Sequence, residues 1–226
     1  MICIIGAMEE EVLALKALSS NPQDFIFEDI ETTLCDIEGR KILIAKSGIG
    51  KANAAYTATV LCLHFHPSLV INIGSAGGLL EGQDIGDIVV ADCCRYHDLD
   101  IGEKTNEDPR FAYYPTPSVI DELETLLKEQ AIPYHKGLMV TGDQFIQKKG
   151  HSYIHLKAWF PNAVCAEMEA GAIASVCSRR KIPFVIVRSI SDLIFQEGNE
   201  VDFDKYLPVA SKKSAQLCKS LITRMF

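Results

Sequence analysis

Acidic side chains follow two apolar runs of this sequence, and both could take part in acid–base chemistry. Residues 184–192 read as a strand buried on both faces that leads into a polar turn, with Asp192 at its tip. In open α/β sheets, ligands bind outside the carboxyl ends of the strands, so an acid placed there can reach a substrate. Asp192 could equally be a helix N-cap, because Ser and Asp after a strand often begin the next helix. These residues alone leave both interpretations open.

The second acidic cluster, Glu9 to Glu11, follows the short β run Ile2 to Gly6. Three acids suit the first turn of a helix, where they complement the helix dipole. The same segment lies just past the carboxyl end of a strand, where a sheet of this type presents side chains to a ligand. We therefore expect one of the three glutamates to be functional.

Small residues mark two further turns. Residues 47–51 invite a phosphate-loop interpretation, but the Walker pattern needs Gly at position 45 and Ser or Thr at position 52, and both are Ala. Asn53 stands where a dinucleotide-binding loop needs Gly or Ala. Residues 75–78 form either a tight turn, which we slightly favour, or a stretch where backbone N–H groups approach a ligand.

The hydrophobic periodicity predicts an α/β fold. Predicted strands lie at residues 2–6, 25–30, 33–37, 41–45, 69–74, 87–91, 137–143 and 184–192. Predicted helices lie at residues 52–63, 119–130, 166–178 and 202–226. Strands outnumber the helices that could cross between parallel pairs, so we expect a mixed sheet.

Length and composition favour a single domain over residues 1–226. The chain has 226 residues, of which 48% are hydrophobic, enough to bury a sizeable core. No change of composition marks a linker. The longest polar run, residues 102–110, is too short to separate domains and reads as an excursion from one fold.

Charge and hydropathy exclude several partners. A net charge of −8 without a dense Lys/Arg stripe argues against nucleic acid. The apolar start, residues 1–6, lacks the basic region and length of a signal peptide, and no apolar run approaches the roughly 20 residues of a membrane span. We expect a soluble, cytosolic protein.

The sequence predicts neither a metal site nor a cofactor. Its eight cysteines include no C-x-x-C pair and lie mostly in apolar stretches, as structural thiols do in a reducing compartment. His64 and His66 flank Phe65, and His151 and His155 lack the glutamate of a zinc-binding helix.

Seven short blocks of the sequence, in this order, resemble the 5′-methylthioadenosine/S-adenosylhomocysteine nucleosidases. The blocks are residues 6–11, 47–51, 74–78, 96–98, 142–146, 166–170 and 188–192. The resemblance implies the three-layer α/β/α nucleoside phosphorylase fold with a central mixed, twisted sheet, and usually a homodimer. Phe111, Tyr113 and Tyr114, aromatic residues on the polar excursion, could reach a neighbouring site.

The resemblance also implies the roles of individual residues. Asp192 would be the general acid at purine N7, Glu11 would polarise the attacking water, and Glu169 would hold the ribose hydroxyls. Further positions implied to line the base and sugar sites are Ser75, Ala76, Gly77, Phe145, Ile146 and Ser191. Positions implied to form the apolar 5′ end are Met8, Ile49, Met168 and Phe203.

The implied reaction is hydrolysis of an adenine-type nucleoside, with water as co-substrate. Related phosphorylases hold phosphate with an arginine two residues before the glycine that matches Gly74, and this chain has Asn72 there. The alternatives are hydrolysis of futalosine or its 6-amino analogue, phosphorolysis, and nucleoside binding without catalysis. Retention of Glu11, Glu169 and Asp192 together argues against the last of these.

Overall fold

A mixed sheet forms the middle of the molecule. The computed structural model describes residues 1–225. Within them ten strands join in the order β2-β3-β4-β1-β5-β10-β6-β9-β8-β7, and β7 pairs back to β10, so that one end of the sheet closes on itself. The strands are β1 (Ile2–Gly6), β2 (Ser20–Phe27), β3 (Ile30–Ile37), β4 (Arg40–Lys46), β5 (Leu69–Asn72), β6 (Ser75–Gly78), β7 (Ile88–Tyr96), β8 (Tyr134–Thr141), β9 (Ala163–Glu167) and β10 (Phe184–Leu193).

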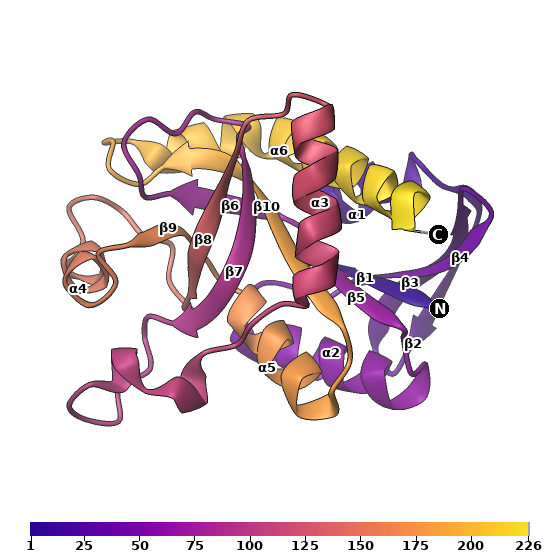
Figure 1. Cartoon of the computed structure of the whole chain (residues 1–226), viewed down its shortest axis with the longest axis horizontal. Helices are drawn as coiled ribbons and strands as arrows, with labels where there is room; N and C mark the ends of the chain where they lie inside the picture. The colour runs from indigo at the N-terminus through magenta and orange to yellow at the C-terminus, as the bar shows by residue number, and fades with distance from the viewer. Residues whose placement is uncertain (226) are drawn as a thin grey trace.

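Helices cover both faces of this sheet. Figure 1 shows α1, α3 and α6 on one side and α2 and α5 on the other. The helices are α1 (Glu9–Lys16), α2 (Lys51–His64), α3 (Pro117–Glu129), α4 (His151–Trp159), α5 (Ala170–Arg180) and α6 (Asn199–Met225), with 3₁₀ turns at Thr105–Glu107 and Pro109–Phe111. The predicted three-layer fold with a mixed sheet is confirmed.

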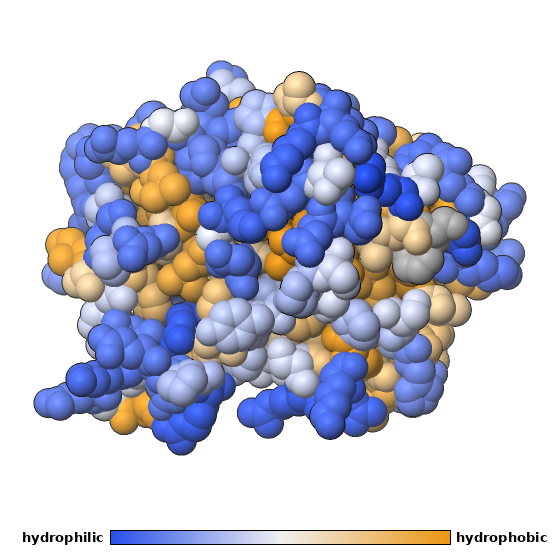
Figure 2. Space-filling view, viewed as in Figure 1, coloured by the Kyte–Doolittle hydropathy of each residue, from blue (hydrophilic) through white to orange (hydrophobic). Residues whose placement is uncertain are grey.

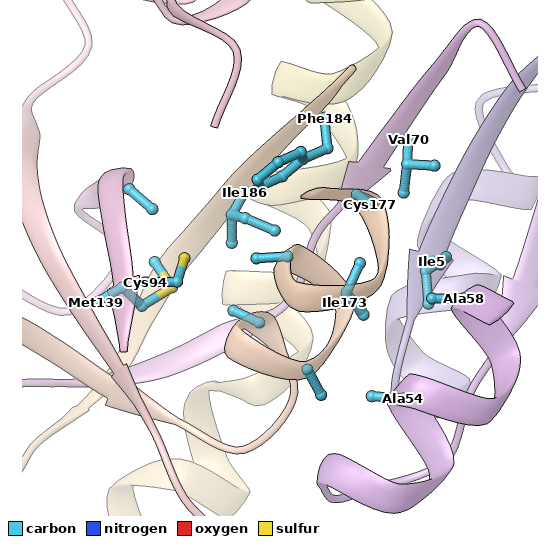
Figure 3. Packing of buried hydrophobic residues seen from close by; sticks show 14 of the residues in the cluster. Ile5, Ala54, Ala58, Val70, Cys94, Met139, Ile173, Cys177, Phe184 and Ile186 are labelled. Carbon is cyan, nitrogen blue, oxygen red and sulfur yellow. The ribbon is translucent and has the colours of Figure 1, made fainter. Parts of the chain in front are cut away.

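Alternate residues of the central strands supply two separate cores. In β1, Ile2 and Ile4 pack with α1, α3 and α6, whereas Cys3 and Ile5 pack with α2 and α5. Figure 3 shows the second core, with Ile5 facing Ala58 of α2. Successive side chains of a strand point to opposite faces, so a strand covered on both sides must be apolar throughout. The outer surface of α3 is hydrophilic (Figure 2), as its amphipathic sequence requires.

Three sequence-based assignments differ from the structure. Residues 75–78 form the strand β6 and not a tight turn. The helix predicted from residue 166 begins at Ala170, because residues 163–167 are fully buried between β6 and β8 and pair with both. The strand predicted at residues 25–30 contains a hairpin turn, in which Glu28 and Asp29 both have positive φ, at 48° and 64°.

Helix α4 was not predicted from the sequence, and it contains His151 and His155. No group of His, Cys, Asp and Glu side chains within residues 1–225 could hold a metal ion. None of the helices within residues 1–225 is long and apolar enough to cross a membrane. All eight cysteines are free thiols.

Candidate active site

A cavity of about 290 Å³ opens at the carboxyl ends of β1, β9 and β10 and beside the start of β6. Every residue that the resemblance placed at a substrate site lines it, namely Met8, Glu11, Ile49, Ser75, Ala76, Gly77, Phe145, Ile146, Met168, Glu169, Ser191, Asp192 and Phe203. Its other lining residues are Ala7, Gln144, Ala166, Glu167 and Ile194. The structure thus brings residues that lie far apart in the sequence, from Met8 to Phe203, around one cavity. Their roles in a reaction stay predictions.

Glu11 is the glutamate of the first acidic cluster that enters the cavity. Its side chain is 2% exposed, whereas Glu9 and Glu10 are exposed and Glu9 pairs with Lys46 at 2.9 Å. The N–H groups of Ala7 and Ser75 donate to its two carboxylate oxygens at 2.7 and 3.1 Å. Burial raises the pKa of Glu11, against the lowering effect of these hydrogen bonds.

Glycine makes room for this carboxylate. A Cβ on Gly74 would lie 2.8 Å from Glu11 Oε1, closer than side chains tolerate. The absence of a side chain on Gly74 therefore lets the backbone after β5 come close to Glu11. There the N–H of Ser75 binds a carboxylate of the protein itself.

Asp192 lies inside β10 and is not a helix cap, because α6 begins only at Asn199. The pairing of β10 with β6 shifts register between Ile190 and Asp192, an irregularity of the kind that re-aims side chains. Ser191 and Asp192 both line the cavity as a result. Asp192 is 2% exposed, and burial raises the pKa of its carboxyl.

Glu169 follows β9 and faces the loop before α2. The N–H of Gly50 donates to its Oε1 at 2.9 Å. Burial first, and then the charge of Glu167, raise the pKa of Glu169 to about 8. This shift favours the protonated carboxyl, which can both donate to and accept from a hydroxyl.

A buried ion pair lies beneath these acids, and sequence reasoning gave it no role. Arg188 Nη2 of β10 donates to Glu167 Oε2 at 2.6 Å and to Asn72 Oδ1 at 2.7 Å, and the hydroxyl of Thr141 donates to Glu167 Oε1. Both members of the pair are almost fully buried. The sequence does contain one signal for this ion pair: Arg188 stands in an otherwise largely apolar strand. A charge buried in such a strand requires a partner of opposite charge.

The rim of the cavity is held by polar contacts among three loops. Lys51 donates its N–H to Asp143 at 2.7 Å and its Nζ to Asp98 at 2.6 Å, and Asp98 accepts the N–H of Asp143 at 2.9 Å. Two residues after Asp143, the ring of Phe145 meets the ring of Phe203 edge to face at 5.5 Å between centroids. The Lys51 contacts join the loop that carries Ile49 to the loop that carries Phe145.

The phosphorylase superfamily matches residues 1–223 of the chain. A 5′-methylthioadenosine/S-adenosylhomocysteine nucleosidase from Halalkalibacterium halodurans is 41% identical over 99% of this chain and 98% of the relative. The chain belongs to this nucleosidase family.

Solved structures of the nucleosidase family agree with the fold described here. The enzyme from Neisseria meningitidis, in complex with methylthio-immucillin-A, has a TM-score of 0.91 at 30% identity over 98% of this chain and 97% of that chain. The enzyme from Colwellia psychrerythraea, in complex with adenine, has a TM-score of 0.92 at 33% identity over 99% and 95%. The predicted family and fold are confirmed.

One aromatic residue of this nucleosidase family member is not placed as expected. Tyr113 is 8% exposed, exchanges backbone hydrogen bonds with Cys94, and packs its ring against Tyr96. It therefore closes the core beneath the excursion and cannot reach a neighbouring site. Tyr114 is 63% exposed and stays available for that purpose.

Proposed function

We propose that the protein hydrolyses the N-glycosidic bond of 5′-methylthioadenosine and S-adenosylhomocysteine and releases adenine. The observation that carries this proposal is the placement of Glu11, Glu169 and Asp192 around one cavity in a member of the nucleosidase family. Relatives of known structure, bound to adenine or to methylthio-immucillin-A, support an adenine-type nucleoside as the ligand.

Asp192 supplies the general acid. The bond to a neutral purine breaks poorly because the departing anion is strongly basic, and a proton on N7 removes most of that difficulty. Burial raises the pKa of Asp192, which favours the protonated form that a general acid needs. Apolar neighbours such as Ile146 and Ile194 exclude the water that would otherwise compete for it.

Glu11 and Glu169 act on the sugar side. Loss of the base leaves a ribosyl group with oxocarbenium character, which negative charge stabilises. Glu11, held by backbone N–H groups at the end of β1, takes a proton from the attacking water. Glu169, steadied by Gly50, binds the 2′- and 3′-hydroxyls.

Water is the nucleophile in this proposal because, among residues 1–225, the side chains that line the cavity include no Lys or Arg to bind phosphate. Asn72 is buried below the cavity, and its amide donates to the carbonyl of Ile5 while its oxygen accepts from Arg188. Arg188 itself is paired with Glu167. A phosphate dianion would need a guanidinium with unused donors directed into the site.

A substrate panel tests the proposal. We expect methylthioadenosine and S-adenosylhomocysteine to release adenine without added phosphate, and 6-amino-6-deoxyfutalosine to compete for the site. The pocket formed by Met8, Ile49, Met168 and Phe203 is apolar, and one methylthio group contributes only about 1–3 kcal/mol, so 5′ discrimination is weak.

The readout is kcat/KM for these three nucleosides and for futalosine. Turnover of futalosine alone would replace the proposal with a futalosine hydrolase of menaquinone synthesis. Release that requires phosphate and yields ribose 1-phosphate would identify a phosphorylase, and binding without release would identify a nucleoside-binding protein.

We also propose a homodimer whose interface includes α2 and the excursion after β7. Both lie along the lower edge of Figure 1. These elements carry three large side chains that are at least half exposed, namely Tyr56, Ile101 and Tyr114. Exposed apolar patches often mark a surface that binds another protein chain. Ile49 lines the cavity two residues before the start of α2 and is 51% exposed, so a partner chain against α2 would narrow the opening.

Sedimentation tests the dimer. We expect the parent chain to sediment as a dimer and Tyr114→Lys to shift it towards the monomer, because a charge would be buried at the interface. Ile26→Lys, at a comparably exposed site on the edge strand β2, is the matched control and should leave the dimer intact. A monomeric parent with full activity would refute the proposal.

The remaining proposals concern the organisation and location of the chain. Because all described strands join one sheet, we propose that residues 1–226 act as one domain. Seven of the free cysteines are buried without forming disulfides, which supports a cytosolic location, where thiols stay reduced. We propose a role in methionine salvage on the basis of the proposed substrates alone.

A further inference from the structure

Asn199 is a buried polar residue directly behind Asp192. It is the first residue of α6, is 1% exposed, and does not line the cavity. Its Nδ2 donates to Asp192 Oδ2 at 2.6 Å and to the carbonyl oxygen of Ile146 at 3.0 Å. One amide group therefore joins β10, α6 and the segment between β8 and α4.

An ion pair also joins the segment between β8 and α4 to the loop between β10 and α6, but it contributes little to stability. Lys149 and Glu197 form an ion pair at 3.1 Å, with side chains 78% and 64% exposed. Solvent and salt screen such a pair, and ordering two long side chains opposes it. The hydrogen bonds of Asn199 are shielded from water, so they hold Asp192 against the segment between β8 and α4 more firmly than this ion pair does, together with the ring contact between Phe145 and Phe203.

The two oxygens of Asp192 have partners of different chemistry. The hydroxyl of Ser191 donates to Oδ1 at 2.9 Å, and a hydroxyl can turn to accept instead. The amide nitrogen of Asn199 can only donate. It therefore favours the ionised carboxylate over the protonated acid, in opposition to the effect of burial.

We propose that Asn199 is the positioning residue of the general acid in the hydrolysis proposed above, on which this inference rests. In that step the O–H bond of Asp192 breaks, the proton moves to purine N7, and the electron pair of the glycosidic bond moves into the base. Asn199 stabilises the carboxylate that this transfer leaves behind. Through Ile146 it also holds the acid in place against the backbone that faces the base.

Removal of the amide is expected to reduce turnover more than binding. In Asn199→Ala and Asn199→Asp, kcat for methylthioadenosine should fall by about 10- to 100-fold, because the hydrogen bond involves a charge that develops in the transition state. KM should change by less than about threefold, since neither variant alters a residue that lines the cavity.

The pH profile separates this role from a purely structural one. Asp192 must be protonated to act, so kcat falls as the pH rises through its pKa. Asn199 lowers that pKa, and its loss should move the alkaline fall to higher pH in Asn199→Ala. The movement should be larger in Asn199→Asp, which adds a like charge.

The other groups near Asp192 are the same in both variants. Ser191 and the charge of Asp202 act on it directly, and Glu11 and Glu169 face it across the cavity. Their contributions to the profile therefore cancel in the comparison with the parent. The ordered shift, with Asn199→Asp beyond Asn199→Ala, follows only from the change at Asn199.

Glu197→Gln is the matched control, because it removes the exposed ion pair from the same loop and should leave kcat and the pH profile unchanged. Circular dichroism and thermal unfolding confirm that each variant is folded. If the parent is active and both Asn199 variants have the same kcat and the same pH profile as the parent, the inference is wrong. A parent chain that releases no adenine would instead refute the proposed function.

Discussion

Asp192→Asn is expected to lower kcat for methylthioadenosine by about 10²- to 10⁴-fold, the usual loss when a general acid is removed. Asn keeps the size of the side chain, and its oxygen can still accept from Asn199 while the Ser191 hydroxyl turns to accept from its NH₂ group, but it cannot give a proton to N7. Nucleoside binding should persist, since the ribose and 5′ contacts are unchanged. Stopped assays of adenine release and calorimetric binding measure the two quantities separately.

The same variant should alter how stability depends on pH. Burial raises the pKa of Asp192 in the folded protein, so the folded state binds a proton that the unfolded chain has lost. The parent's free energy of unfolding therefore decreases as the pH rises from the unfolded pKa to the folded pKa. Asp192→Asn lacks this contribution and should be at least as stable as the parent at neutral pH.

Asp204→Asn provides the control for a neutralised acid nearby. Asp204 is exposed on α6, the helix that follows β10, and its replacement should leave activity within a few-fold of the parent. If Asp192→Asn also retained activity within a few-fold, Asp192 would not be the acid.

The sequence was sufficient to locate the main strands and the ligand edge. Runs such as residues 69–71 and 184–187 are apolar on both faces, and that pattern requires a covered sheet whatever the details of packing. Glu11 and Asp192 could be placed at strand ends on the same basis. The local pattern could not separate Glu11 from Glu9, because either fits the first turn of a helix. It also could not separate a functional Asp192 from a helix cap. The resemblance to the nucleosidases made both choices.

Features that depend on distant partners could not be read from the sequence. Glu167 was expected on a helix, since alanines and glutamates favour helices, but pairing of β9 with both β6 and β8 overrides that preference. Asn199 has no local signal at all. Its importance arises because the chain returns to Ile146 and Asp192, 53 and 7 residues away, at the start of α6.

Glu11→Gln is expected to reduce hydrolysis by about 10²- to 10⁴-fold, because an amide cannot take a proton from water. The environment of the side chain also makes a structural demand. Backbone N–H groups of Ala7 and Ser75 donate to opposite oxygens of Glu11, and an amide offers only one oxygen. One donor must then face the amide NH₂ group, which costs about 1–3 kcal/mol for an unsatisfied buried group.

Two measurements separate these effects. Thermal unfolding should show the modest loss of stability, and single-turnover release of adenine, measured with the site saturated, should show the much larger loss of chemistry. Glu9→Gln and Glu10→Gln are matched controls, because both glutamates belong to the same first turn of α1 and are exposed. If Glu11→Gln hydrolysed methylthioadenosine normally while either control did not, the base would be the residue changed in that control, and α1 would have to turn in solution to bring it into the cavity.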